Sequence, residues 1–505
     1  MRTSRFPTLA ALAAVVVLGA GSAGAVELRI GLQEDPDVLD PDQSRTFVGR
    51  IVYTALCDKL VDITPDLKIV PQLATGWTWS DDGKALTMDL REGVTFHDGT
   101  PFDAEAVKAN IERSKNLPES RRKSELTSVE SVEVTGPYQV TMNLKNADAT
   151  LLAQLADRSG MMISPTAAEA AGLDFGNNPI CSGPFKFVER VQQDRIVLDK
   201  YDGYWNKGAI HIDRVVYLPI PDTTVRLANL RSGDLQMIER VAATDVKSAK
   251  ADSSLTVVEA IGLGYQGMTI NVGNGAKAKN PVGENKLVRQ AIELAIDRNV
   301  VNQVVFEGNY VPGNQPFPPN SSWYDKSTPI PGRDVAKAKA LLKQAGFDKL
   351  QVEVQMANNP VQTQVMQVIQ SMAAEAGIDI QLKATEFAAM LKEQSAGNYQ
   401  VSQVGWSGRI DPDGNLHQFV TCKGGINDSK YCNPKVDELL NAARTSNDEE
   451  VRKDYYDQAN AILREELPII YLYHPTWVWA LSNKVSGFVP YPDGMIRLEN
   501  VKVAM

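Results

Sequence analysis

Strand-like and helix-like patterns alternate along the chain. Alternating apolar and polar positions predict strands at residues 27–30, 85–90 and 214–218. Asp103 and Asp222 are followed by apolar positions at helical spacing, and an Asp at such a place accepts the free N–H groups of the first turn. The first half of the chain therefore mixes strands with helices.

The second half contains a β-α-β order. We predict a strand at 350–354, a helix at 361–376 that Gly377 ends, and a further strand at 378–382. This order is typical of an α/β fold with parallel strands. A chain of 505 residues is too long for one ordinary core, so we expect two or three domains.

Composition narrows the classes of function. Lys and Arg total 52 against 62 Asp and Glu, and no long basic run occurs, so we expect no nucleic-acid partner. Only four His and four Cys are present, which argues against a resident metal or haem, and we expect no cofactor.

The first residues have the pattern of an export signal. Arg2 and Arg5 precede an apolar run at 9–18, and Ala23 and Ala25 flank a Gly in the A-x-A pattern that signal peptidase accepts. The run is about half of the ~20 residues that a bilayer requires. We predict a signal peptide at residues 1–25, cleavage after Ala25, export, and no stable membrane insertion.

Export makes disulfides possible. Cys422 and Cys432 are separated by a segment rich in turn-forming Gly, Asn and Asp, which predicts a local disulfide. Cys57 and Cys181 form the leftover pair. They are either bridged or two free buried thiols, and the sequence leaves both possibilities open.

Catalytic motifs are absent from the sequence. It contains no P-loop, no H-E-x-x-H and no G-x-S-x-G. One G-x-G-x-x-G occurs at Gly262, Gly264 and Gly267, but a strand-like stretch follows where a dinucleotide site needs a helix, so we interpret it as a turn. A secreted hydrolase would need a nucleophile, a base and an orienting acid that the sequence does not assemble. We therefore predict that the protein is not an enzyme.

Several stretches resemble one family. The stretch PQLATGWTWSDDGKALTMDLREGVTFHDGTPFDAEAV is similar to the signature region of the family 5 extracellular solute-binding proteins, which serve ABC importers for peptides, nickel and glutathione. The similarity runs through the whole chain. Further matching stretches lie at residues 178–205, 284–319, 405–440, 472–492 and 498–503.

The resemblance implies a fold and a division into domains. We expect a bilobed periplasmic binding protein fold, with two mixed α/β lobes that close about a hinge. Lobe I would comprise residues 26–264 and a return segment at 481–505, with an additional subdomain at 55–173. Lobe II would comprise residues 265–480.

The resemblance also implies a function. The protein would be the periplasmic substrate-binding component of an ABC importer. It would capture a small peptide or peptide-like solute and deliver it to the membrane permease as a monomer. In similar dipeptide-binding proteins the equivalents of Cys422 and Cys432 form a disulfide.

The sequence departs from the peptide receptors at both peptide anchors. Arg409 stands where the family places the Asp that holds the peptide ammonium, although Asp411 or Asp413 could take over that role. Asn359 lies where dipeptide binders use an Arg for the peptide carboxylate. Arg409 is a candidate donor to an anionic solute, or else forms an internal salt bridge with Asp411 or Asp413.

Two aromatic residues and one Asn complete the predicted site. Trp406 and Tyr265 are candidates for the cleft wall, since aromatic faces bury apolar solute surface. Asn359 is a candidate hydrogen-bonding group, with a turn-forming role as the alternative. A second hypothesis keeps the fold but gives it a non-peptide anionic solute or a nickel-type metal chelate, for which His417 is the candidate ligand.

Overall fold

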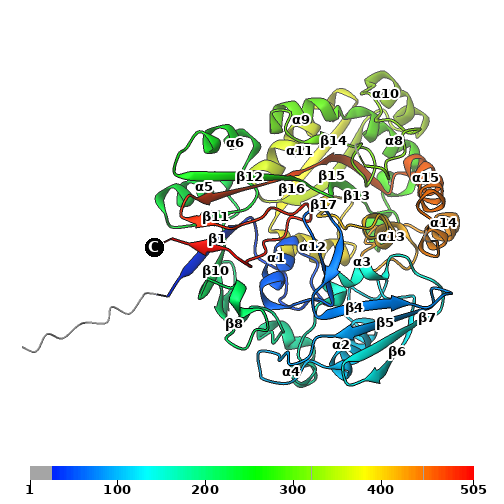
Figure 1. Cartoon of the computed structure of the whole chain (residues 1–505). Helices are drawn as coiled ribbons and strands as arrows, with labels where there is room; N and C mark the ends of the chain where they lie inside the picture. Colours follow the sequence, from blue (N-terminus) through cyan, green and yellow to red (C-terminus); the bar gives the residue numbers. More distant parts are fainter. Residues whose placement is uncertain (1–24, 320, 447, 505) are drawn as a thin grey trace, which may run out of the picture.

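Two large sheets form the centres of two lobes in the computed structural model, which describes residues 25–319, 321–446 and 448–504 (Figure 1). The predicted bilobed α/β fold is confirmed. Of the predicted signal peptide, only Ala25 lies within the described residues.

The first sheet has seven strands in the order β12-β19-β11-β1-β10-β9-β8. Strand β1 lies at its centre and pairs in parallel with β10 and β11, while the outer pairs are antiparallel. The strands are β1 (Glu27–Leu32), β8 (Phe185–Val191), β9 (Arg195–Lys200), β10 (Arg214–Pro219), β11 (Met237–Ile238), β12 (Leu255–Ile261) and β19 (Thr476–Ser482).

The second sheet has six strands in the order β14-β18-β13-β17-β15-β16. Strands β15 and β16 are parallel and are connected by helix α11, which is the β-α-β unit predicted from the sequence. The strands are β13 (Tyr265–Ile270), β14 (Val311–Pro312), β15 (Leu350–Ala357), β16 (Ile378–Thr385), β17 (Val401–Trp406) and β18 (Ile469–His474).

The chain crosses between the sheets twice, at adjacent places. It leaves β12 for β13 through Gly262–Gly264, where the predicted division after residue 264 falls, and it returns from β18 to β19 at Pro475. The predicted return at residue 481 is therefore too late. Residues 476–480 pair with β12 in the first sheet, a long-range pairing that a local pattern does not reveal.

The glycines of the G-x-G-x-x-G motif serve this crossing. A Cβ on Gly264 would lie 1.9 Å from the Trp406 carbonyl oxygen, and one on Gly262 would lie 2.6 Å from that of Pro475. Only a residue without a side chain allows such a close approach. Strand β13 begins directly afterwards, so the structure agrees with a turn and not with a dinucleotide site.

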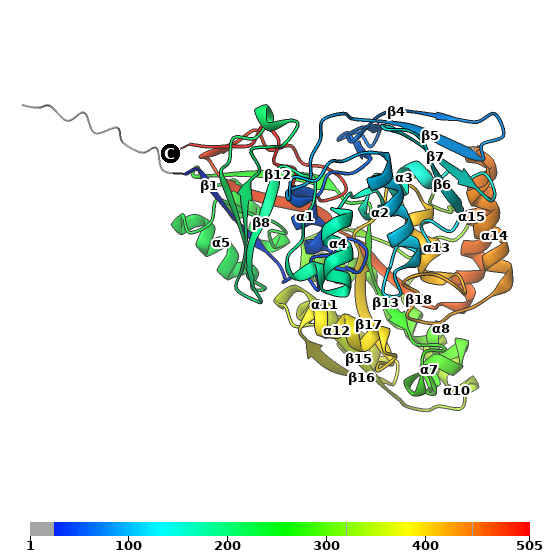
Figure 2. The same cartoon turned by 90° about the horizontal axis from the view of Figure 1, so that it is seen from below.

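A four-stranded antiparallel sheet, β4-β5-β7-β6, forms a subdomain with its own core, whose buried residues run from Leu60 to Met162. Figure 2 shows this sheet on the far side of helices α2 and α3 from the strands of lobe II. Its strands are β4 (Ala74–Trp79), β5 (Ala85–Leu90), β6 (Val129–Gly136) and β7 (Gln139–Leu144); the small pairs are β2 (Val61–Ile63) with β3 (Ile69–Pro71) and β20 (Val485–Ser486) with β21 (Lys502–Val503).

Capping side chains start many of the helices, as the sequence predicts. Asp103 accepts a hydrogen bond from Ala106 N at the start of α2, and Asp222 caps α5, which ends at Gly233 with φ 89°. The helices are α1 (Phe47–Leu56), α2 (Ala104–Asn116), α3 (Leu151–Leu155), α4 (Pro165–Ala171), α5 (Thr223–Ser232), α6 (Ala243–Lys250), α7 (Pro281–Glu284), α8 (Lys286–Ala295), α9 (Arg298–Phe306), α10 (Val335–Gln344), α11 (Pro360–Glu375), α12 (Phe387–Ser395), α13 (Asp413–Val420), α14 (Pro434–Arg444) and α15 (Glu449–Glu466), with 3-10 turns η1 (Arg158–Gly160), η2 (Gly172–Asn177), η3 (Lys207–Ala209) and η4 (Ala276–Ala278).

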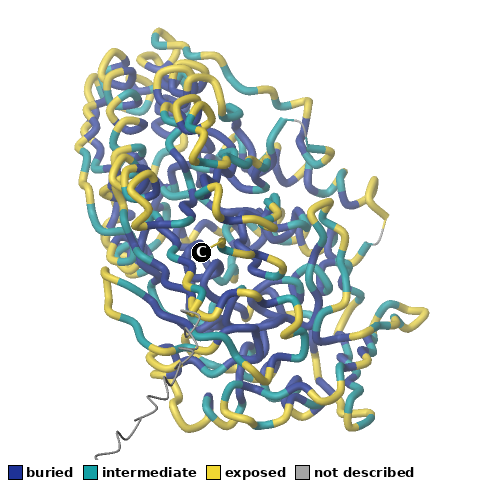
Figure 3. The backbone as a smooth tube through the Cα atoms, turned by 60° about the vertical axis from the view of Figure 1, so that its left-hand side comes forward, coloured by how far each residue is buried: buried dark blue, intermediate teal, exposed yellow. Residues whose placement is uncertain are grey.

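Buried positions concentrate in the interior of the molecule, and exposed positions lie on its outer segments (Figure 3). Both cysteine pairs are bonded. Cys422 is bonded to Cys432 as predicted. Cys57 is bonded to Cys181, so of the two alternatives that the sequence left open, the structure has the bridge and not the free thiols. The Cys57–Cys181 bond connects the end of α1 to the segment before β8.

Within the described residues, no helix has both the length and the apolar character needed to cross a membrane.

Candidate functional site

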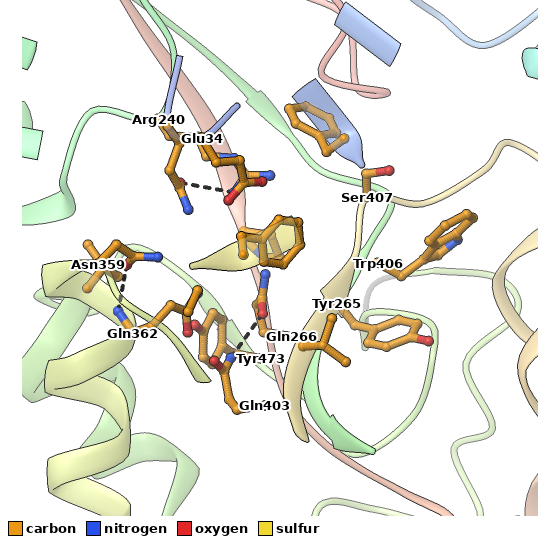
Figure 4. Close-up of a pocket in the computed structure, with 18 of the residues that line it drawn as sticks. Glu34, Arg240, Tyr265, Gln266, Asn359, Gln362, Gln403, Trp406, Ser407 and Tyr473 are labelled. Atoms are coloured by element: carbon orange, nitrogen blue, oxygen red, sulfur yellow. Dashed lines mark hydrogen bonds between the residues drawn. The ribbon is translucent and has the colours of Figure 1, made fainter. Parts of the chain in front are cut away.

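A cavity lies between the two lobes. It contains about 1660 Å³ of space free of protein atoms, part of it open to solvent, and both large sheets contribute residues to its wall. The segments that follow the carboxyl ends of strands contribute key polar residues. Glu34 follows β1, Arg240 follows β11, Asn359 follows β15 and Ser407 follows β17 (Figure 4). Ligands of open α/β sheets typically bind at such strand ends.

Glutamine side chains form one polar wall. Gln403 Nε2 donates to Gln266 Oε1 at 3.1 Å, and these two residues come from the paired strands β17 and β13 (Figure 4). Gln362, in the first turn of α11, faces the same space, and its buried Oε1 has no hydrogen-bond partner among the described residues. Neutral amides of this kind can both donate to and accept from a solute.

Glu34 places a carboxylate in the cavity. The residue is 8% exposed, and within the described residues its carboxylate makes no hydrogen bond or ion pair. Burial raises the pKa of Glu34 to about 7 despite the opposing effect of nearby Arg240, while Glu239 and Glu386 raise it further. A cationic group of a solute would find an unpaired partner here.

Arg240 holds its guanidinium beside Glu34 (Figure 4). Its Nη1 donates to Gln33 Oε1 at 3.0 Å, and the guanidinium lies 4.6 Å from the ring centre of Phe47. The backbone of Arg240 has φ 51°, an unfavourable conformation for a residue with a side chain. Such strain is concentrated at functional sites, which agrees with the position of Arg240 at the cavity.

Trp406 and Tyr265 line the cavity, and they also belong to the core of lobe II. The two residues are paired across β17 and β13, and their rings lie on the opposite side of these strands from Gln266 and Gln403 (Figure 4). Trp406 Nε1 donates to Asn415 Oδ1 at 3.0 Å, so its polar atom is already used. The two rings therefore pack in the core of lobe II directly behind the strands that form this wall of the cavity.

Asn359 caps a helix and lies at the cavity. Its Oδ1 accepts from Gln362 N at 2.9 Å and caps α11, and the residue also lines the cavity. Its amide nitrogen donates no hydrogen bond to the described residues, and Figure 4 shows it directed away from the helix.

Arg409 and Asp411 do not line the cavity. Arg409 Nε lies 2.8 Å from Asp157 Oδ2 in an ion pair, and its guanidinium stacks 4.1 Å from the ring centre of Trp406. Asp411 pairs with Arg452 at 2.7 Å. The internal salt bridge considered for Arg409 thus exists, but its partner is Asp157 and not Asp411 or Asp413, because the subdomain brings a carboxylate from a distant part of the chain.

His417 also lies outside the cavity. It is buried, and its Nε2 is hydrogen-bonded with Asn441 Oδ1 at 3.0 Å. Burial is the main cause that lowers the pKa of His417 to about 4. Across the described residues, no group of three or more His, Cys, Asp and Glu is placed to hold a metal ion. The geometry offers His417 no route to a chelated metal in the cavity.

Buried charges connect the lobes across the cavity. Arg45, which precedes α1, pairs with Asp428 of lobe II at 2.6 Å. Arg50 of α1 donates to Ser407 Oγ at 2.8 Å and also pairs with Asp157 at 2.5 Å. The Arg45–Asp428 pair and the Arg50–Ser407 hydrogen bond join the two lobes, whereas the Arg50–Asp157 pair connects α1 with the subdomain of lobe I.

Sequence reasoning missed most of the polar cavity residues. Glu34 and Arg240 belong to no motif, and nothing in their immediate neighbours marks them. Only their positions could have indicated a role. Glu34 follows strand β1 and Arg240 follows the short strand β11, at the carboxyl ends where α/β proteins bind ligands. Arg122 and Arg158, which also line the cavity, come from the subdomain and have no such signal.

The fold and the cavity between the lobes define a solute-binding protein with two lobes. Residues 68–427 match the model of the bacterial extracellular solute-binding proteins, family 5, and the chain belongs to this family.

Relatives cover almost the whole chain. The glutathione-binding protein GsiB of Salmonella paratyphi A is 29% identical, covering 97% of this chain and 94% of its own length. The dipeptide-binding protein of Escherichia coli K12 is also 29% identical, with 97% of each chain covered. The structure of the binding protein AgaA from A. tumefacien R10, in complex with agropinic acid, superposes with a TM-score of 0.85 at 27% identity, covering 95% of this chain and 99% of the other.

Proposed function

We propose that this protein is the substrate-binding component of an ABC importer. It captures one small solute, a peptide or a peptide-like compound, between its lobes and delivers the solute to the membrane permease. The observation that carries the proposal is the cavity between the two sheets, whose aromatic and apolar wall also carries charged and amide groups. Membership of the family and the names of its relatives support the same function.

The proposed action is binding without chemical change. Closure of two lobes removes a solute from water, so a few buried polar groups such as Glu34, Arg240 and the glutamines determine which solute is retained. The two disulfides and the N-terminal pattern support export to the periplasm with removal of residues 1–25. We propose that the protein acts there as a monomer and not as an enzyme.

Native mass spectrometry tests this function. The mature chain is unfolded in guanidinium with its disulfides intact, refolded free of solute, and incubated with a bacterial extract. We expect one non-covalent adduct per protein, and the same mass of the solute before and after release. Loss of the solute as a smaller product would indicate turnover and contradict the proposal, as would a protein that retains nothing.

The chemistry of the cavity favours one refinement of the solute class. The residue that corresponds to the ammonium anchor of the peptide receptors is Arg409, which lies behind the wall in an ion pair. Arg45, Arg122 and Arg240 of the cavity wall pair with Asp428, Glu125 and Glu239, whereas Arg158 has no carboxylate closer than 3.8 Å. Arg158 therefore supports an anionic group on the solute.

A further inference from the structure

Four buried arginines meet at the subdomain side of the cavity. The arginine cluster consists of Arg50, Arg122, Arg158 and Arg409 together with the carboxylates of Glu125 and Asp157, and each of the six is at most 6% exposed. Four positive charges face two negative ones, so the cluster has an excess of two positive charges. Unpaired buried charge is costly, because the charged form loses its hydration.

The two carboxylates are already shared within the cluster. Asp157 pairs with Arg50 at 2.5 Å and with Arg409 at 2.8 Å. Glu125 pairs with Arg122 at 2.5 Å and also accepts a hydrogen bond from Ser159. No carboxylate is left for Arg158, whose nearest acidic contact is Asp157 at 3.8 Å.

Arg158 is the least satisfied member of the cluster. A guanidinium has five N–H donors, yet within the described residues the side chain of Arg158 makes one hydrogen bond, from Nη1 to the Ser44 carbonyl at 2.8 Å. Its buried Nε has no hydrogen-bond partner there, and neither has Nε of Arg122. Both arginines line the cavity, whereas Arg50, Arg409 and the two carboxylates lie behind them.

We propose that the solute carries a carboxylate, or an oxyanion of similar size, that accepts hydrogen bonds from Arg158 and Arg122. The inference rests on the proposed function and names the chemical class of its solute. An anion at this place would reduce the charge excess and occupy donors that the protein leaves free. Burial and the neighbouring Arg122 are the leading causes that lower the pKa of Arg158, to about 9, as expected for a cation that lacks a partner.

Glu34 provides the matched opposite charge. It is buried in the same cavity, but its unpaired carboxylate repels an anion instead of binding it. Removing the charge of Glu34 should therefore strengthen the binding of an anion, whereas removing the charge of Arg158 should weaken it.

The test uses succinate and phosphate as probes with the refolded, solute-free protein. Thermal unfolding is followed over a range of probe concentrations at constant ionic strength, with chloride as the reference. We expect a saturable stabilisation of the wild type by at least one probe. Arg158→Gln should weaken this apparent affinity about tenfold or more, Arg158→Lys should weaken it less, and Glu34→Gln should strengthen it.

Arg289→Gln serves as the control for loss of a buried arginine. Arg289 is 8% exposed and bonded to the backbone carbonyls of Glu466, Val282 and Gly283, and it lies outside the cavity wall, so the variant should bind the probes as the wild type does. Circular dichroism checks that each variant is folded. If Arg158→Gln does not fold, Arg122→Gln takes its place with the same expected direction.

The possible results distinguish failure of the anion-site proposal from failure of the proposed solute-binding function. No stabilisation by either probe beyond that of chloride, or equal stabilisation of Arg158→Gln and the wild type, would overturn the anion site. A solute from the extract that is retained but gains no mass on methyl esterification and contains no phosphate would also overturn it, while the proposed function would stand. Failure to retain any solute would contradict the function itself.

Discussion

Glu34 shows how one buried side chain can set the chemistry of a cavity. Burial raises its pKa from the ordinary 4.5 to about 7, so around neutral pH the group exists in both charged and neutral forms. In the charged form it favours an ammonium or guanidinium of a solute, and in the neutral form it can donate a hydrogen bond to an oxygen.

Glu34→Gln should change how stability depends on pH. The unfolded chain loses the proton near pH 4.5, whereas the folded chain keeps it up to about pH 7, so the wild type loses stability as the pH rises through this range. The variant lacks this loss. We expect it to equal the wild type below pH 4.5 and to exceed it by up to about 3 kcal/mol at pH 8.

Urea unfolding of both proteins between pH 4 and pH 8 measures this difference. A constant offset between the two proteins across that range would contradict the shifted pKa of Glu34. Other buried carboxyls, such as Asp58 with a pKa raised to about 7, titrate equally in both proteins and cancel in the comparison.

At single residues, the sequence predicted the site only in part. Trp406, Tyr265 and Asn359, which the residue types and the resemblance singled out, lie at the cavity. Arg409 was predicted to have either a solute or a nearby Asp as its partner, and its actual partner comes from 252 positions earlier in the chain, at Asp157. A partner so distant depends on how the subdomain docks, which no local pattern encodes.

Among the elements, the sequence predicted regular structure well. The strands at 85–90, 350–357 and 378–385 and helix α11 begin within one residue of their predicted starts, because turn residues and apolar periodicity mark these boundaries directly. The return to the first sheet at Thr476 was missed, since β18 and β19 are both apolar and follow one another almost without a break.

The two disulfides should differ in their effect on stability. Cys57 and Cys181 are 124 positions apart, whereas Cys422 and Cys432 are ten apart. A bond that closes a longer loop removes more conformational entropy from the unfolded chain. Replacing the first pair by Ser should therefore cost about 2 kcal/mol more than replacing the second.

Urea unfolding of the two double variants measures this cost, with the wild type as reference. Equal losses, or a larger loss for the Cys422–Cys432 variant, would show that loop length does not govern the contribution of these bonds.

For the whole molecule, charges across the cavity should hold the closed state. Asp428 of lobe II pairs with Arg45 of lobe I, and Gln394 also donates to it at 2.7 Å. Asp428→Asn keeps the shape but removes the charge. We expect solute to leave this variant about tenfold faster, which corresponds to roughly 1.4 kcal/mol.

Native mass spectra recorded at intervals after dilution follow the loss of solute. Asp454→Asn is the matched control, because Asp454 is exposed on α15 and bonds Gln458 of the same helix. Equal rates for Asp428→Asn and the wild type would contradict a role of the Arg45–Asp428 pair in closure.

The central claim is that a solute is held in the cavity between the lobes, and a blocked cavity tests it most directly. Gly405 lines the cavity, and a Cβ there would meet the flexible end of the Gln266 side chain at 2.3 Å, so Gly405→Trp should fill the space and leave β17 in place. At Gly208 a Cβ would meet no atom of the described chain within 4 Å, which makes Gly208→Trp the control.

The measurement is the native mass spectrum of each protein after incubation with the bacterial extract. We predict one solute on the wild type and on Gly208→Trp, and none on a folded Gly405→Trp. Retention of the same solute by Gly405→Trp at the wild-type level would contradict the account, because the solute would then bind elsewhere.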